Sequence, residues 1–299
     1  MSLIAIFLLL LSSFAHAGWN YIGKKSIPST SFFFIANTAG VLYMSPILIY
    51  RFHIINLFPI RVLVFQCVSG FFLAAYMSML GMAYHSGEVS IEYPIIRSIS
   101  LIFITFISYL IQANKSFNIF IIGGIILTIF GSLSIRLQQY TKREIQKYFT
   151  FSNFPSLMAS IWIAGYTSVD YYALKILKLI GFGPLMGTLL YQVLEGISTS
   201  FWMLILILLQ KKEKVKFSAA IHDYLGAAAL SGFGIYLAYG LVLLAMNYVK
   251  NVTYVAAFRQ LSIPIGALLG IFLLKEPVYT PKTIGIIFIF IGVILISLF

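Results

Sequence analysis

The chain is a succession of long apolar runs separated by short polar gaps. A membrane-spanning helix needs about 20 predominantly apolar residues, and ten stretches reach that length. These runs lack the alternation of a barrel strand, and a helix satisfies its own backbone hydrogen bonds, as lipid requires. The pattern predicts an all-α polytopic membrane protein with ten transmembrane helices, at about 2–22, 32–50, 62–84, 88–111, 117–137, 154–175, 183–209, 222–247, 252–274 and 280–298.

The polar gaps are too short to hold a soluble domain. Only two of them are longer and clearly polar, RLQQYTKREIQKYFTFSN at 136–153 and QKKEKVKFS at 210–218, and we predict that both are connections. A functional site is therefore expected within the membrane.

Composition supports the membrane class and excludes others. Apolar residues make up 61% of the chain and charged residues 9%, against roughly 45–50% and 25% in soluble domains. The single cysteine, Cys67, excludes an internal disulfide framework and offers no zinc site. The net charge of +12 lies in short gaps and not on a water-facing domain, so it indicates membrane orientation and no nucleic-acid partner.

The longer gap near the middle separates two halves with five predicted spans each. A shift of 162 residues places Arg97 on Arg259 and Ser100 on Ser262, and the register holds without a gap across spans four–five and nine–ten. An odd number of spans per repeat makes the two repeats inverted in the membrane, and such transporters bind substrate at the repeat interface. We predict repeats at 1–137 and 154–299, joined by a polar connector at 138–153.

The first apolar run has two interpretations. MSLIAIFLLLLSSFAHA ends in the small-x-small pattern of a signal-peptide cleavage site. Its first residues, MSLIAIF, carry no positive side chain, and removal of residues 1–17 would leave nine spans. We therefore expect a retained first span.

Five ionisable side chains fall inside the predicted membrane spans. Arg97 and Arg259 lie near the middle of spans four and nine, and the acidic residues are Glu92, Asp170 and Glu195. Such groups cost about 2.5–3.5 kcal/mol each on insertion scales unless they are paired or hydrated. Two hypotheses follow for the arginines: ion pairs that lock helices together, or binding of an anionic or zwitterionic substrate in an aqueous cavity. Low dielectric disfavours an ionised carboxylate, so Glu195 and Asp170 are candidate proton carriers.

Short motifs add a resemblance. HAGWN at 16–20, YPIIR at 93–97, GYTSVD at 165–170 and FRQLSIPIGALLGIFLLKEP at 258–277 resemble the EamA-like family of the drug/metabolite transporter superfamily. Glu92 departs from that pattern, in which a small or apolar residue is usual. The resemblance covers nearly the whole chain and implies ten helices in two inverted five-helix repeats and a transport function.

The candidate substrate-binding residues combine the arginines with this motif. Tyr93 shares a helix face with Arg97, four residues on. Trp19 and Tyr166 occupy matching places in the two repeats, where they either line a cavity or pack helices. The complete set is Arg97, Arg259, Tyr93, Trp19, Asn20 and Tyr166, with Glu195 and Asp170 for proton coupling.

These observations predict a secondary transporter of a small polar organic metabolite, an amino acid or related anion or zwitterion, working by alternating access. No HExxH, CxxC, P-loop or GxSxG motif occurs, so we expect neither an enzyme nor a metal or cofactor. The alternatives are a lipid-linked carrier flippase and a non-transporting membrane enzyme or scaffold. We expect a monomer with the lipid bilayer and a small-molecule substrate as partners, in a plasma or bacterial inner membrane.

The orientation of the chain stays open. Twelve Lys and Arg residues fall on the side of the odd-numbered connections and six on the other side, which favours both termini outside. Members of the family that the chain resembles usually have both termini inside.

Overall fold

A computed structural model describes residues 2–26, 28–86, 89–111, 119–135, 137–146, 148, 153–274 and 277–298. Its described residues form helices and no strand. The helices are α1 (Leu3–Lys25), α2 (Thr30–Tyr50), α3 (Phe52–Ile55), α4 (Ile60–Ser86), α5 (Val89–Ile111), α6 (Ile119–Ser134), α7 (Lys142–Gln146), α8 (Phe154–Leu179), α9 (Pro184–Leu209), α10 (Lys211–Met246), α11 (Val252–Phe258), the 3-10 helix η3 (Arg259–Leu261), α12 (Ser262–Leu274) and α13 (Thr280–Leu298).

Local sequence explains several of these boundaries. Ser29 caps α2 by accepting a hydrogen bond from the backbone N–H of Phe32, and Asn251 caps α11 in the same way. Pro184 lies in the first turn of α9, where its missing N–H costs no hydrogen bond. Among the described residues, α2, α4, α5, α9 and α10 contain stretches long and apolar enough to cross a membrane, and shorter apolar segments lie in α1, α6, α11–α12 and α13. The all-helical, multi-pass membrane class predicted from the sequence is confirmed.

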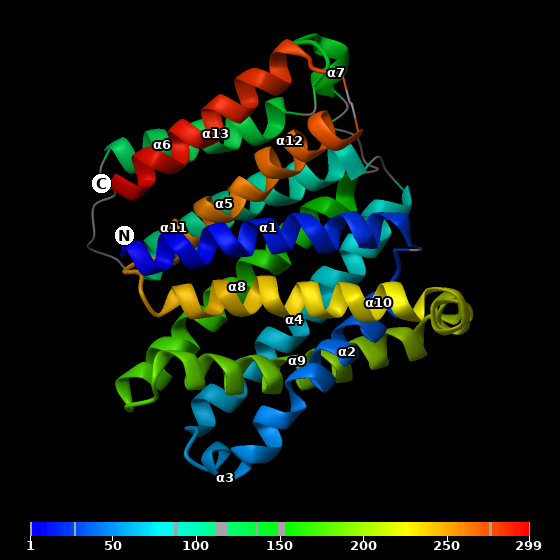
Figure 1. Cartoon of the computed structure of the whole chain (residues 1–299), viewed down its shortest axis with the longest axis vertical. Helices are drawn as coiled ribbons and strands as arrows, with labels where there is room; N and C mark the ends of the chain where they lie inside the picture. Colours follow the sequence, from blue (N-terminus) through cyan, green and yellow to red (C-terminus); the bar gives the residue numbers. More distant parts are fainter. Residues whose placement is uncertain are drawn as a thin grey trace.

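The helices form successive layers (Figure 1). α6 packs on α13 at one end of the molecule, and α2, α4 and α9 pack together at the other end. Between them, α1 packs on α10 while α8 packs on α4 and α5. The centre of the molecule is therefore built from helices of both halves of the chain.

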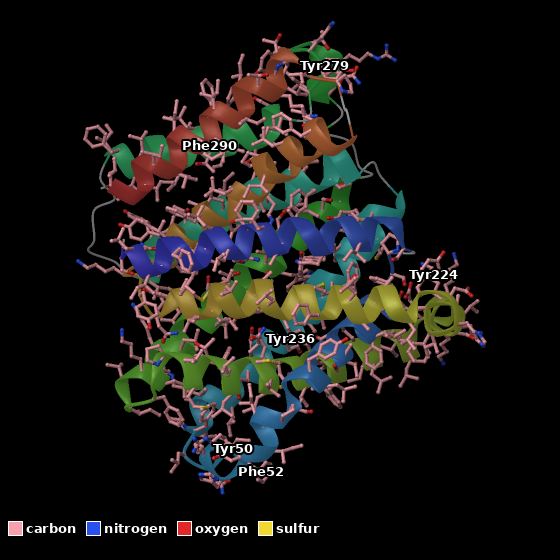
Figure 2. The ribbon with its side chains drawn as sticks, viewed as in Figure 1. Tyr50, Phe52, Tyr224, Tyr236, Tyr279 and Phe290 are labelled. Atoms are coloured by element: carbon pink, nitrogen blue, oxygen red, sulfur yellow. The ribbon has the colours of Figure 1, made fainter. Side chains whose placement is uncertain are left out.

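The α6–α13 pair depends on glycines where the backbones approach closely. A Cβ atom added at Gly131 would lie 2.7 Å from the carbonyl oxygen of Gly285, and one added at Gly124 would lie 2.6 Å from that of Gly292. Such distances allow no side chain, so these four glycines bring the two helices together. Many large apolar side chains of the molecule point outward, Phe290 among them (Figure 2), as a lipid-facing surface requires.

One predicted boundary is wrong, and one predicted span is interrupted. The stretch 210–218 is not a connection, because α10 begins at Lys211 and its first turns contain the polar segment. The span predicted at 252–274 keeps those bounds but is interrupted, because α11 ends at Phe258 and a 3-10 turn follows at Arg259–Leu261. Pro264 explains the break: it cannot donate a hydrogen bond to the carbonyl of Gln260, and its ring crowds that carbonyl.

Candidate functional site

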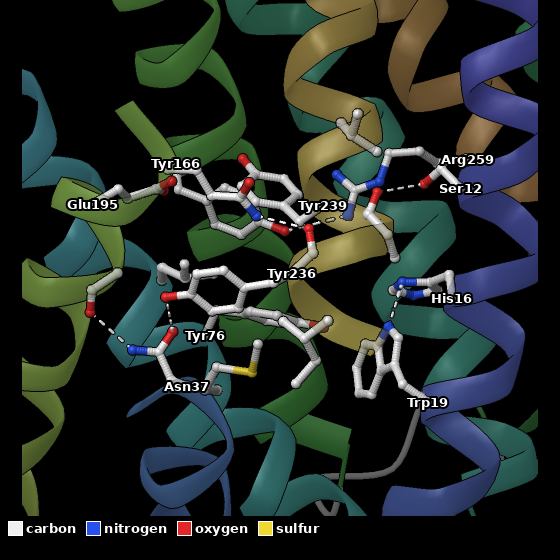
Figure 3. Close-up of a pocket in the computed structure, with 17 residues that line it drawn as sticks. Ser12, His16, Trp19, Asn37, Tyr76, Tyr166, Glu195, Tyr236, Tyr239 and Arg259 are labelled. Atoms are coloured by element: carbon white, nitrogen blue, oxygen red, sulfur yellow. Dashed lines mark hydrogen bonds between the residues drawn. The ribbon is translucent and has the colours of Figure 1, made fainter. Parts of the chain in front are cut away.

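A cavity lies in the centre of the molecule and contains about 570 Å³ of space not occupied by atoms, part of it open. Its walls come from α1, α2, α4, α8, α9, α10 and η3, so both halves of the chain contribute. Five of the lining side chains are large aromatic residues, and most of them are tyrosines (Figure 3): Trp19, Tyr76, Tyr166, Tyr236 and Tyr239.

Arg259 faces this cavity from the 3-10 turn (Figure 3). It is buried, and one terminal nitrogen donates to the Tyr166 hydroxyl at 3.4 Å. Its guanidinium carbon lies 5.6 Å from the centre of the Tyr239 ring, a cation–π distance. Among the described residues no carboxylate lies within ion-pair distance of Arg259. The cavity therefore has a positive side chain on its wall that the described residues do not neutralise directly.

Glu195 also lines the cavity, from the middle of α9. Its Oε1 lies 2.9 Å from the Ser69 hydroxyl, and the same hydroxyl contacts Oδ1 of Asp170. Asp170 is fully buried and also accepts hydrogen bonds from Tyr191, at 2.7 Å, and from Tyr239. The two carboxyl groups that the sequence predicted as proton carriers therefore meet at one serine hydroxyl.

The second arginine lies in a different environment. Arg97 is buried on α5, where its Nε donates to the Tyr93 hydroxyl at 3.2 Å and a terminal nitrogen contacts Nε2 of His16. Among the described residues it has no carboxylate partner, and it is not part of the cavity lining. It reaches the cavity through His16, which lines it.

Arg97 and Tyr93 also connect α5 to the broken span. The Gln260 side-chain amide donates to the Arg97 carbonyl at 2.9 Å, and the hydroxyls of Tyr93 and Ser262 lie 3.0 Å apart. The two segments that the 162-residue shift aligned are thus bonded to each other.

The structure divides the sequence-predicted site residues into two groups. Trp19, Tyr166, Arg259 and Glu195 line the cavity. The others lie behind its wall: Asp170 through its bond to Tyr239, Arg97 through His16, and Tyr93 through Arg97. The Asn20 side chain lies outside the described residues.

Sequence reasoning missed several lining residues because it considered only the ionisable groups inside the spans and the residues of the short motifs. Asn37 accepts a hydrogen bond from the Tyr236 hydroxyl at 3.2 Å, and Gln192 donates to the Tyr236 carbonyl at 2.8 Å. The neutral amides Asn37 and Gln192 lie inside apolar spans, and this could have identified them from the sequence as candidate lining residues. Serine is among the commonest residue types in the chain, so nothing in the sequence distinguished Ser69 as a site residue.

No group of three His, Cys, Asp or Glu side chains that could hold a metal ion occurs in the described part of the chain. The cavity lining offers hydrogen-bonding groups, tyrosine hydroxyls among them, together with three other titratable groups of different chemistry: the Arg259 guanidinium, the Glu195 carboxyl group and the His16 imidazole.

Comparison with known proteins finds one family model that part of the chain matches. Residues 179–298 match the model of the EamA-like transporter family, which confirms the resemblance predicted from the sequence over that part. A solved crystal structure with 12% sequence identity covers 99% of this chain and 97% of its own, at a TM-score of 0.65. That likeness shows the fold alone. No curated protein matches the chain.

Proposed function

We propose that this protein is a secondary membrane transporter of a small zwitterionic metabolite, an amino acid or a related compound. One observation carries the proposal: Arg259 and Glu195 face the same cavity from opposite sides, with tyrosine rings between them (Figure 3). A ligand with a carboxylate and an ammonium group matches this distribution of charge.

The anionic end of the ligand fits Arg259. A buried arginine without a carboxylate partner is costly in a membrane, and its planar fork binds a carboxylate through two parallel hydrogen bonds. The ammonium end fits the Glu195 side of the cavity, where the carboxyl group offers an acceptor oxygen and tyrosine faces attract a cation. The cavity therefore offers each end of a zwitterion a complementary group.

The arrangement of the helices supports an inverted repeat and alternating access. If α1, α2, α4 and α5 correspond to α8, α9, α10 and α11–α12, then the packing of α1 on α10 corresponds to that of α8 on α4. The contact of α2 with α10 likewise matches that of α9 with α4. Repeats at 1–137 and 154–299 would rock against each other around the central cavity, in a plasma or bacterial inner membrane.

The position of the arginines favours this function over a lipid-linked carrier flippase. A flippase would present unpaired arginines to a lateral, lipid-open groove. Arg259 instead faces a cavity walled by helices of both halves, and Arg97 is bonded to Tyr93 and His16.

The test is counterflow in proteoliposomes that hold purified protein and an unlabelled mixture of the twenty L-amino acids. We expect external radiolabelled amino acids to accumulate transiently, and protein-free liposomes serve as the control. Competition then tests the two-ended site: amino-acid amides lack the carboxylate and 2-hydroxy acids lack the amine. We expect each analogue to compete about 10-fold or more weakly than its parent, because one buried charged group is left unpaired.

Two outcomes would contradict the proposal. The first is an absence of counterflow by folded protein, and the second is equal competition by the parent amino acid and both analogues.

A further inference from the structure

We propose that Glu195 and Asp170 share one exchangeable proton through the hydroxyl of Ser69, and that this proton is the coupling ion of transport. The shared proton is independent of the proposed function, whereas its role as the coupling ion rests on that function. The sequence offered Glu195 and Asp170 as separate candidates, whereas the structure makes them one unit with a third member.

The Ser69 hydroxyl has a single hydrogen but lies between two carboxyl groups. Its hydroxyl lies within hydrogen-bond distance of Glu195 Oε1 and of Asp170 Oδ1. A hydroxyl has one hydrogen and can donate to only one carboxylate at a time. If both acids were ionised, the other contact would set two lone pairs against each other inside a buried site. One of the two carboxyl groups must therefore carry a proton and donate it to Ser69.

The neighbours assign that proton to Glu195. Asp170 accepts from the Tyr191 and Tyr239 hydroxyls in addition to Ser69, and three donors stabilise its ionised form. The carboxyl group of Glu195 has Ser69 and the carboxyl group of Asp170 as its hydrogen-bond partners among the described residues, and no tyrosine hydroxyl there donates to it. The order is then Glu195 O–H to Ser69 and Ser69 O–H to Asp170, which gives the pair a single negative charge.

Every helix packed around the pair contributes a polar group, and these groups explain how proton and substrate communicate. The titratable groups that face the pair or its cavity are His16 from α1, Tyr76 from α4, Tyr166 from α8, Tyr191 from α9, Tyr236 and Tyr239 from α10 and Arg259 from η3. The neutral polar groups are Ser12 from α1, Asn37 from α2, Ser69 from α4 and Gln192 from α9.

Tyr239 is the direct connection between proton and substrate. Its hydroxyl donates to Asp170 and its ring lies beneath the guanidinium of Arg259. Arg259 independently indicates a ligand in the cavity. It is buried, it faces the cavity, and no carboxylate among the described residues pairs with it. A substrate on Arg259 and a proton on Glu195 are thus held by one connected set of side chains. When Glu195 loses its proton to water in the cavity, the pair gains a second negative charge beside the bound substrate.

Infrared pH titration of the purified protein tests the shared proton without any ligand. We expect wild type at neutral pH to show a protonated carboxyl band that Glu195→Gln removes. Difference spectra cancel the other carboxyl groups, Glu92 among them. Ser69→Ala should shift this band and its titration, Ser69→Thr should restore both, and Ser132→Ala should change neither.

Ser132 is a matched control because it is a fully buried serine whose hydroxyl donates to the Thr128 carbonyl. A band that persists in Glu195→Gln, or a wild-type titration in Ser69→Ala, would overturn the inference. Should Ser69→Ala fail to fold, the Glu195→Gln spectrum decides by itself.

Proton movement tests the coupling. In proteoliposomes containing a pH-sensitive dye, net uptake of the labelled amino-acid mixture by wild type should move protons, and Ser69→Ala should shift the pH dependence of that uptake, which Ser69→Thr should restore. Wild-type uptake without proton movement would overturn the coupling while leaving the transport function in place. Conversely, an absence of uptake would overturn the transport function, and the infrared result would stand independently.

Discussion

Arg97 and Arg259 occupy related positions 162 residues apart, yet their surroundings differ. Arg97 lies on an uninterrupted stretch of α5 and is held by Tyr93 and His16. Arg259 lies at the 3-10 break of the corresponding span and faces the central cavity, in contact with Tyr166 and Tyr239. Both are buried, and within the described residues neither has a carboxylate partner.

The difference lies in the backbone as much as in the side chains. Pro94 falls early in α5, where the carbonyl four residues before it, that of Ser90, belongs to the first turn. Pro264 instead crowds the carbonyl of Gln260, directly beside Arg259. The same type of residue at a different offset leaves one arginine on a regular helix and the other at a helix break. Two aligned charges can therefore enter different surroundings, one bonded to neighbouring side chains and the other facing a cavity.

The largest effect should come from the arginines themselves. Arg259→Lys keeps the charge but loses the planar fork, so we expect counterflow to fall about 10- to 100-fold, the equivalent of one charged hydrogen bond. Arg97→Lys should reduce counterflow less than about threefold, because its neighbours are protein side chains, while lowering the free energy of unfolding by about 1 kcal/mol. Counterflow and thermal unfolding of both variants in the same lipid measure this. Equal losses of transport would remove the distinction between the two arginines.

The tyrosines next to the arginines should show a smaller difference. Tyr239→Phe keeps the ring beneath Arg259 but removes the donor to Asp170, so we expect a several-fold loss of counterflow and a stability loss of about 1–2 kcal/mol. Tyr93→Phe removes the contacts with Arg97 and Ser262, and we expect about 1 kcal/mol of destabilisation with transport unchanged. The same two assays apply, and Tyr93→Phe serves as the matched control. A transport defect in Tyr93→Phe that equals that of Tyr239→Phe would show that Arg97 also acts in binding.

The smallest effect should come from the prolines. Pro264→Ala permits a regular helix through the break and moves Arg259, so we expect counterflow to fall about two- to fivefold, under about 1 kcal/mol. Pro94→Ala changes a position near the start of α5 and should leave transport within error. Substrate competition by the amino-acid amides sharpens the result, because only Pro264→Ala should alter their relative affinity. An unchanged Pro264→Ala would mean that the 3-10 turn does not place Arg259.

The sequence by itself determined the class of protein and most of its helices. Apolar length fixes a membrane span locally, so the predicted stretches agree with α1, α2, α4, α5, α6, α8, α9 and α13 within a few residues. It also identified the costly side chains, Arg97, Arg259, Asp170 and Glu195, because an ionisable group in an apolar run stands out. The prediction of a connection at 210–218 was wrong, because a helix can continue beyond the apolar stretch that crosses the membrane.

Which of these side chains meet depends on how the helices pack. Arg259 faces the cavity from the 3-10 break of its span, and Glu195 meets Asp170 because α4 brings Ser69 between α8 and α9. Neutral residues such as Asn37, Gln192 and Tyr239 became part of the site only through packing. The physical reason is that hydrophobic length and period are local properties of a helix. Lateral contacts join residues more than 100 positions apart, and nothing in the local pattern encodes which faces come together.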